Sequence, residues 1–155
     1  MQLDWYAINT KPRQEAIADV FLSQAGIETF FPKVAPGRAL FTSYIFTKFD
    51  PETQLRLVKY SKGVKSIVSL GGTPTPIDES LIDAIKDRIK EGFVHLDPPS
   101  FTKGEKVEIK EGLLEGVTGI FSSHIKDSDR VIILLNAISY QSKMVVPSVL
   151  LRKIS

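Results

Sequence analysis

The chain has 155 residues and a formal net charge of +2, with 43% of the residues hydrophobic and 25% charged. This composition is typical of a soluble globular protein of one ordinary domain or two small ones. The small net charge does not by itself indicate nucleic-acid binding, and the absence of cysteine excludes disulfides, thiol catalysis and cysteine-based zinc sites. The N-terminus lacks the layout of a signal peptide, and no apolar run approaches the ~20 residues that span a bilayer. We therefore expect a soluble, cytoplasmic protein without membrane contact.

Residues 1–92 alternate between strand-like and helix-like segments. Thr10 is a candidate N-cap with Pro12 in the first helical turn, Gly26 supplies a stop, and Asp78 is a candidate cap for a later helix. The first predicted elements are a strand over 3–9 and a helix between Thr10 and Gly26, whose apolar face contains Ala16, Ile17, Val20 and Phe21. Strands over 28–33 and 40–49 follow. A short helix within 51–60, a strand over 64–70 and a helix between Asp78 and Gly92 complete the series. This order predicts an antiparallel sheet with packed helices, which is an α+β fold.

The stretch from 91 to 100 contains a glycine and a double proline, which cannot continue a helix. We therefore predict a linker over 93–100 that separates a domain of residues 1–92 from a domain of residues 101–155.

The second domain favours short strands. Residues 106–110 alternate between polar and apolar side chains, glycines and a polar turn follow, and 130–135 is rich in β-branched residues. Five short strands with closely spaced turns predict a small β-barrel, with Phe121 and the apolar run in its core.

The apolar run from Val131 to Leu135 has a second interpretation. Together with Ala137, Ile138 and Met144 it also forms an apolar stripe at helical spacing. Pro147 would break a long second helix. The sequence leaves both the strand and the helix state open.

Residues 103–121 resemble the KOW motif, in which a strand, a turn around a Gly-x-x-x-Gly pair and a second strand open a five-stranded barrel. The pair here is Gly112 and Gly116, and glycines suit the bulges that barrel closure requires. Upstream, three segments resemble the amino-terminal domain of NusG/RfaH-type transcription factors: Trp5-Tyr6 before an amphipathic helix, the aromatic strand 40–46, and the step Lys62-Gly63-Val64.

The resemblance covers nearly the whole chain. It implies a ferredoxin-like antiparallel sheet with packed helices in the first domain and a five-stranded KOW barrel in the second. The segment from Arg130 to Asn136 resembles the tail of RfaH-type specialised members. In those proteins the second domain also exists as an α-hairpin that masks the polymerase-binding face, so the resemblance includes this alternative state.

The function implied by the resemblance is transcription elongation and antitermination, without enzymatic activity and without a cofactor. Such factors bind the clamp of the largest RNA polymerase subunit, contact non-template or upstream DNA, and reduce pausing and termination. The second domain is implied to couple transcription to a small-subunit ribosomal protein. We expect the chain to act as a monomer.

The residues that the resemblance assigns to polymerase binding are Tyr6, Phe41, Tyr44 and Phe46. Because side chains alternate along a strand, Tyr44 and Phe46 point to one face while Phe41 and Phe49 point to the other. One set fills the core, and we expect the other to form a bare aromatic patch for a partner.

A basic stretch from Thr53 to Ile77 contains no acidic residue. It is either an ordinary solvated face or a positive lip for DNA, which Lys11 and Arg13 would extend. The candidate DNA-binding residues are Lys11, Arg13, Arg56, Lys59 and Lys62.

Phe121 and Arg130 are the candidate interface residues of the KOW domain.

Several positions depart from the RfaH pattern. Arg38 stands near the place where RfaH carries an acid that pairs with the arginine matching Arg130, and two arginines cannot form that bridge. Among the positions that RfaH uses to read its DNA element, Lys11 matches the family. Phe21 and Gln24 stand where the family has polar or basic DNA-reading residues.

No metal or catalytic site is predicted, because His95 and His124 stand alone and no nucleophile-base arrangement is visible. The alternative function is a ribosome- or RNA-associated KOW protein. That alternative predicts a basic barrel, yet residues 101–155 carry 8 basic and 6 acidic side chains, which favours it little.

Overall fold

A four-stranded antiparallel sheet forms the centre of the molecule. The computed structural model describes residues 2–96, 120 and 125–139. The sheet consists of β1 (Asp4–Thr10), β2 (Glu28–Phe30), β5 (Tyr44–Phe49) and β6 (Val64–Ile67), in the spatial order β2-β5-β1-β6. The helices of the first domain are α1 (Glu15–Gln24), α2 (Pro51–Lys59) and α3 (Glu79–Lys86). This is the ferredoxin-like arrangement that the resemblance implies, and it confirms the α+β class expected from the order of elements.

Three small hairpins surround the sheet. They are β3 (Lys33–Val34) with β4 (Arg38–Ala39), β7 (Ser69–Leu70) with β8 (Thr73–Pro74), and β9 (Ile89–Lys90) with β10 (Phe93–Val94). The hairpin β9-β10 occupies the end of the helix that was predicted between Asp78 and Gly92. α3 ends at Lys86, and Glu91 and Gly92 both have positive φ, as the type I′ turn that reverses the chain requires.

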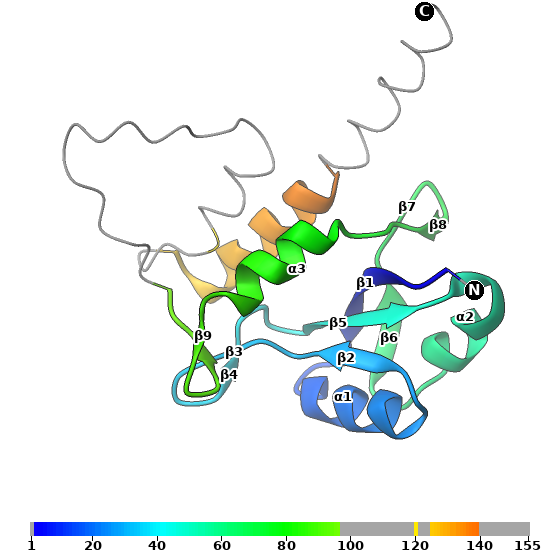
Figure 1. Ribbon diagram of the computed structural model, residues 1–155, viewed down its shortest axis with the longest axis horizontal. Helices are drawn as coiled ribbons and strands as arrows, with labels where there is room; N and C mark the ends of the chain where they lie inside the picture. The colour runs from blue at the N-terminus through cyan, green and yellow to red at the C-terminus, as the bar shows by residue number, and fades with distance from the viewer. Residues whose placement is uncertain (1, 97–119, 121–124, 140–155) are drawn as a thin grey trace, which may run out of the picture.

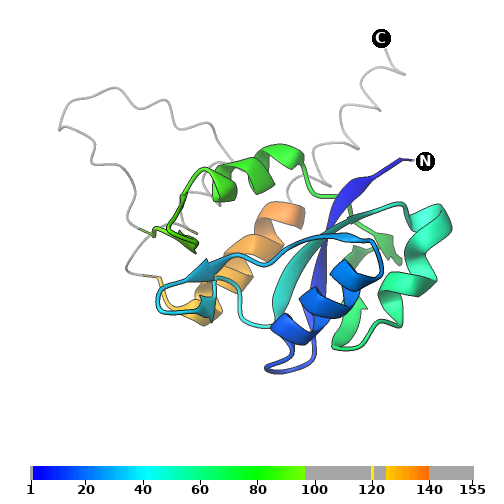
Figure 2. The ribbon, with the colours of Figure 1, turned by 60° about the horizontal axis from the view of Figure 1, so that its bottom comes forward.

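Helices lie on both faces of the sheet (Figure 1), and each face buries its own core. One face packs on α1 and α2, and its core contains Tyr6, Ile8, Ile45, Phe49, Ala18, Leu22 and Val58. The other face lies under α3 and under a second helix over residues 127–139, which we call the tail helix. Figure 2 shows the tail helix beside α3 on this same face.

The tail helix differs from the strand expected over 130–135 and corresponds to the helical alternative that the sequence left open. Its buried residues Arg130, Leu134, Ala137 and Ile138 recur at helical spacing, so one stripe faces the domain. A short run of β-branched residues is compatible with a strand or a helix. In this structure the run is helical, and its buried stripe packs on the apolar face of the sheet. Phe121 and the other predicted barrel strands lie outside the described residues.

The first helix begins later than its sequence signals indicate. Thr10 belongs to β1 and its N–H donates to the Ser43 carbonyl at 2.8 Å, so it does not cap the helix. Arg13 has a φ of 61°, which is incompatible with a helical turn, and α1 starts at Glu15. The stop at Gly26 is confirmed by its φ of 86°.

The buried face of α1 also differs from the prediction. Ala18 and Leu22 are buried, whereas Ile17, Val20 and Phe21 are exposed. On this side the backbone of α1 closely approaches Gly63, where an added Cβ would meet the Ala18 nitrogen at 2.9 Å. The absence of a side chain at Gly63 therefore permits the close packing of α1 through Ala18.

The predicted strand over 40–49 is shorter than expected. Residues 40–43 form a turn in which Ser43 has a φ of 66°, and β5 begins only at Tyr44. Other local signals are confirmed: α2 lies within 51–60, and the Asp78 side chain caps α3 by accepting a hydrogen bond from the Ser80 N–H at 3.2 Å. Within the described residues no helix combines the length and apolarity of a bilayer-crossing segment.

Gly63 provides a test of this packing. Gly63→Ala should lower the free energy of unfolding by about 3 kcal/mol, because a left-handed φ and a backbone clash add together. Gly72→Ala is the matched control, since Gly72 has a φ of 89° but nothing within 4 Å of an added Cβ, and it should cost only about 1–2 kcal/mol. Equal losses in denaturant unfolding would contradict the close contact between Gly63 and α1.

Candidate protein-binding face

The surface under the tail helix is built from aromatic rings. Phe46 projects from β5, stacks against Phe30 of β2 at 6.0 Å between ring centroids, and meets Phe41 edge to face at 5.8 Å. Trp5 of β1 meets Phe30 edge to face at 6.5 Å. We call the surface formed by Leu40, Phe41, Tyr44 and Phe46, with Ile82 and Ile85 of α3, the aromatic face.

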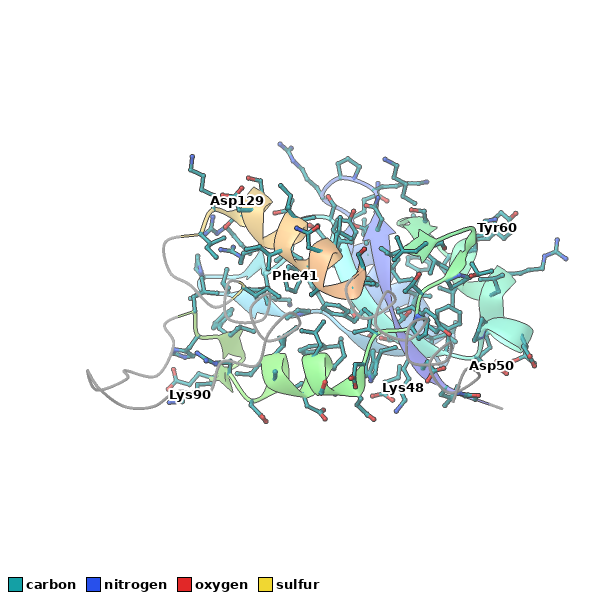
Figure 3. All side chains as sticks on the ribbon, turned by 90° about the horizontal axis from the view of Figure 1, so that it is seen from above. Phe41, Lys48, Asp50, Tyr60, Lys90 and Asp129 are labelled. Atoms are coloured by element: carbon teal, nitrogen blue, oxygen red, sulfur yellow. The ribbon has the colours of Figure 1, made fainter. Side chains whose placement is uncertain are left out.

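The tail helix covers this face. Leu134 and Ile138 are buried in the same core as Phe41 and Phe46, and Val131 packs against it. Figure 3 shows Phe41 by the tail helix, with Asp129 at the start of that helix. Phe41 and Phe46 are 0% exposed, so the expectation of a bare aromatic patch is wrong for this state of the chain. The cover is an amphipathic helix from the chain's own second half.

Tyr44 and Tyr6 lie on opposite faces of the sheet. Tyr44 is half-buried against the covered core, and this burial raises the pKa of its hydroxyl. Tyr6 instead packs on Phe49 at 4.7 Å, in the core beneath α1 and α2. Burial, and then the negative charges of Asp4 and Asp50, raise the pKa of Tyr6. The predicted set of four aromatic residues is therefore not brought together.

The two errors of grouping have different causes. Neighbouring residues of β1 face opposite ways, so Trp5 occupies the side on which Tyr6 was expected. Phe41 precedes β5 and lies in the turn, so its orientation does not follow the alternation of that strand. It consequently joins Phe46 in one core, although the sequence placed these two rings on opposite faces.

Arg130 fixes the tail helix to the aromatic face. It is only 2% exposed. Its Nε donates to the Leu40 carbonyl at 2.8 Å, one terminal nitrogen donates to the Ile125 carbonyl at 3.2 Å, and the other pairs with Asp127. A buried guanidinium is tolerated only when its charge is paired and its N–H groups are bonded, and here both conditions hold.

Asp127 resolves the problem of two facing arginines. Its second carboxylate oxygen accepts a hydrogen bond from Arg38 at 3.0 Å, while its first pairs with Arg130. One acid in the first turn of the tail helix therefore serves both arginines, and its negative charge also suits the positive end of the helix dipole. The sequence contained a signal for this, because an Asp three residues before an Arg pairs with it if the segment is helical.

The predicted DNA-binding residues lie outside the aromatic face, on α2 and on loops at one end of the sheet. Lys11 and Arg13 are exposed on the connection from β1 to α1, and the Lys11 N–H donates to the Gly63 carbonyl at 2.9 Å. This bond brings the connection against the loop that carries Lys62. Arg56 and Lys59 lie in the last turn of α2, which leads into the same loop. We call these five residues the basic patch.

Two aromatic rings accompany the basic patch. The Lys62 ammonium lies 5.3 Å from the ring centroid of exposed Phe21, and the Lys59 ammonium lies 5.8 Å from that of Tyr60. The sequence misassigned Phe21 to the packed side of α1. Within the part of the chain that the structure describes, no group of three or more His, Cys, Asp or Glu side chains could hold a metal ion.

These features define an α+β binding protein whose principal apolar surface accepts an amphipathic helix. A family model described as transcription termination factor nusG matches residues 3–86, which is more than half of the chain, and the chain belongs to this family of transcription factors, which are not enzymes. A solved structure entitled "Domain interaction in Thermotoga maritima NusG" is similar, with 22% identity and a TM-score of 0.46 over 70% of this chain and 71% of that one.

The attachment of the tail helix depends on Asp127 more than on Arg38. Asp127→Ala leaves the guanidinium of Arg130 buried without its counter-ion, which should weaken docking by about 2–4 kcal/mol, somewhat below the range for a fully buried pair because Asp127 is 35% exposed. Arg38 is 64% exposed, so Arg38→Ala should cost at most about 1 kcal/mol.

Hydrogen exchange of residues 127–139 measures both effects. The matched control is Asp129→Ala, which removes an exposed acid from the same helical turn. Faster exchange in Asp127→Ala alone is the expected result. If Asp129→Ala accelerates exchange as much, the loss comes from the helix dipole and the pairing has no special role.

Proposed function

We propose that this chain is a transcription elongation factor that binds RNA polymerase through the aromatic face, and that the tail helix occupies this face while polymerase is absent. Membership of the NusG family supports binding to polymerase. The observation that carries the proposal is the way the aromatic face is occupied. It holds an amphipathic helix along one apolar stripe, which is the helix-in-groove mode of recognition.

A surface that accepts one amphipathic helix suits another of similar character. In the family that the sequence resembles, the partner is a coiled-coil pair of helices in the clamp of the largest polymerase subunit. Such a partner would replace the apolar contacts of Leu134 and Ile138 on Phe41 and Phe46. The tail helix and the polymerase would therefore exclude one another.

The proposed effect on transcription follows from differential binding. A factor that bridges the clamp in one conformation stabilises that conformation relative to the open, paused one. We propose that the chain thereby reduces pausing and termination, as RfaH-type members do. The released residues 101–155 would then form the KOW barrel and couple to a small-subunit ribosomal protein.

The basic patch suits exposed DNA strands near the polymerase. Lys11, Arg13 and Lys62 offer positive charge to phosphates, and the exposed ring of Phe21 offers a surface on which a base can stack. None of the five residues of the patch belongs to the aromatic face, so we propose that polymerase and DNA are bound at the same time.

Polymerase binding is tested by pull-down of purified enzyme without nucleic acid. Asp127→Ala should increase the amount of polymerase retained, because the aromatic face is uncovered. Adding Tyr44→Ala to this variant should reduce retention by about tenfold or more, since a tyrosine at the centre of an interface contributes about 2 kcal/mol.

Tyr60→Ala is the control for the loss of a tyrosine ring. Tyr60 is 73% exposed and lies at the other end of the molecule from the tail-helix start (Figure 3), so this variant should retain polymerase fully. A parallel pull-down from a cell lysate distinguishes the alternative: retention of ribosomal RNA without polymerase would support a ribosome-associated KOW protein and would refute the proposal.

DNA binding is tested by titration with a single-stranded oligonucleotide over a series of salt concentrations. Lys62→Ala should lower the affinity and reduce the slope of log affinity against log salt by about 0.7, because one phosphate contact is lost. Phe21→Ala should lower the affinity while leaving the slope unchanged, because stacking releases no counter-ion. Lys90→Ala, an exposed lysine of β9, is the control and should change neither quantity. A uniform small effect of every lysine would indicate non-specific attraction and contradict a defined patch.

A further inference from the structure

Ser43 adopts a backbone conformation that its side chain disfavours. Its φ of 66° lies in the left-handed region, where residues other than glycine are uncommon. It stands in the turn between Phe41 and Tyr44, the two aromatic residues by which the chain enters β5. An unfavourable conformation at this position persists only if the surroundings hold it.

The last residue of β1 and the first residue of α1 hold both backbone groups of Ser43. The Glu15 carboxylate, on Oε2, accepts a hydrogen bond from the Ser43 N–H at 2.8 Å. The Ser43 carbonyl accepts one from the Thr10 N–H, also at 2.8 Å. Glu15 is 28 residues away in sequence, and its bond is charge-assisted and therefore stronger than an ordinary one.

The same turn sets the rings and the carbonyl that the tail helix contacts. The Tyr44 N–H donates to the Phe41 carbonyl at 3.0 Å and closes the turn. Phe41 then meets Phe46 edge to face. Leu40, immediately before Phe41, presents the carbonyl that accepts from Arg130. Occupation of the aromatic face thus depends on a turn whose least favourable residue is fixed by Glu15.

We propose that Glu15 is a positioning residue for the aromatic face: its carboxylate holds Ser43 in the left-handed conformation and so keeps Phe41 and Tyr44 in the arrangement that binds polymerase. This inference rests on the proposed function. It assigns to the first turn of α1 a part in polymerase binding, although Glu15 itself lies outside the aromatic face.

The experiment uses the full chain carrying Asp127→Ala, in which the aromatic face is uncovered. Polymerase affinity is measured for this parent and for the parent with Glu15→Ala, Glu15→Gln, or Glu15→Ala combined with Ser43→Gly. Glu15→Ala should weaken binding on the order of tenfold to a hundredfold, the range expected for one charge-assisted hydrogen bond. Glu15→Gln keeps an acceptor without the charge, so it should weaken binding only a few-fold.

The rescue by Ser43→Gly separates positioning from simple support of the fold. Glycine adopts positive φ without strain, so Ser43→Gly should restore most of the affinity lost in Glu15→Ala. Asp19→Ala, which removes another acid from α1, is the matched control and should bind as the parent does. Thermal unfolding of every variant identifies any that fails to fold, and Glu15→Gln then replaces Glu15→Ala.

The outcomes distinguish the inference from the function on which it rests. If the Asp127→Ala parent fails to bind polymerase, the proposed function is overturned and the inference falls with it. If the parent binds and Glu15→Ala binds equally well, the inference alone is overturned. Loss of affinity in Glu15→Ala without rescue by Ser43→Gly also overturns it, because the carboxylate would then act through something other than the conformation of Ser43.

Discussion

The buried guanidinium of Arg130 is the constraint on which the covered state of the molecule depends. A positive charge inside an apolar interface must be neutralised and its N–H groups must be bonded, and the observed placement of the tail helix provides a partner for each nitrogen of the guanidinium. Asp127 supplies the charge and the Leu40 carbonyl accepts from Nε. These contacts fix the rotation of the helix and its position along its axis. Leu134 and Ile138 follow one and two turns later and consequently enter the core beside Phe41.

The two faces of the sheet carry different kinds of core. The core beneath α1 and α2 is closed by segments of the first domain, and close contacts such as that between Gly63 and Ala18 fix it. The core beneath α3 is completed by residues 127–139, far away in the chain. Under the proposed function the first core is permanent whereas the second is conditional. Separation of the two cores by the sheet permits one to open while the other keeps the domain folded.

Local signals in the sequence were sufficient for elements whose stability is local. The cap at Asp78, the stop at Gly26 and the helix after Asp50 depend on neighbouring residues and were predictable. Features that depend on distant contacts were not. The side of the sheet that Tyr6 faces follows from the strand register. Residues 130–135 are helical where they pack on an apolar surface contributed by distant parts of the chain, and an apolar run that fits both states gives no means of choosing between them. Asp127 was overlooked because its role exists only if that segment is helical.

The hairpin β9-β10 ends within the core that the tail helix completes. Val94 of β10 and Ile120, which precedes the tail helix, are buried in one cluster, with 97–119 between them in the sequence. A covalent tether that joins neighbouring points keeps its cargo at a local concentration of about millimolar around its site. A partner that binds the aromatic face must therefore displace a tethered tail helix at this local concentration, and a partner that binds weakly does not do so. The hairpin in this way raises the threshold that a partner has to meet before the chain opens.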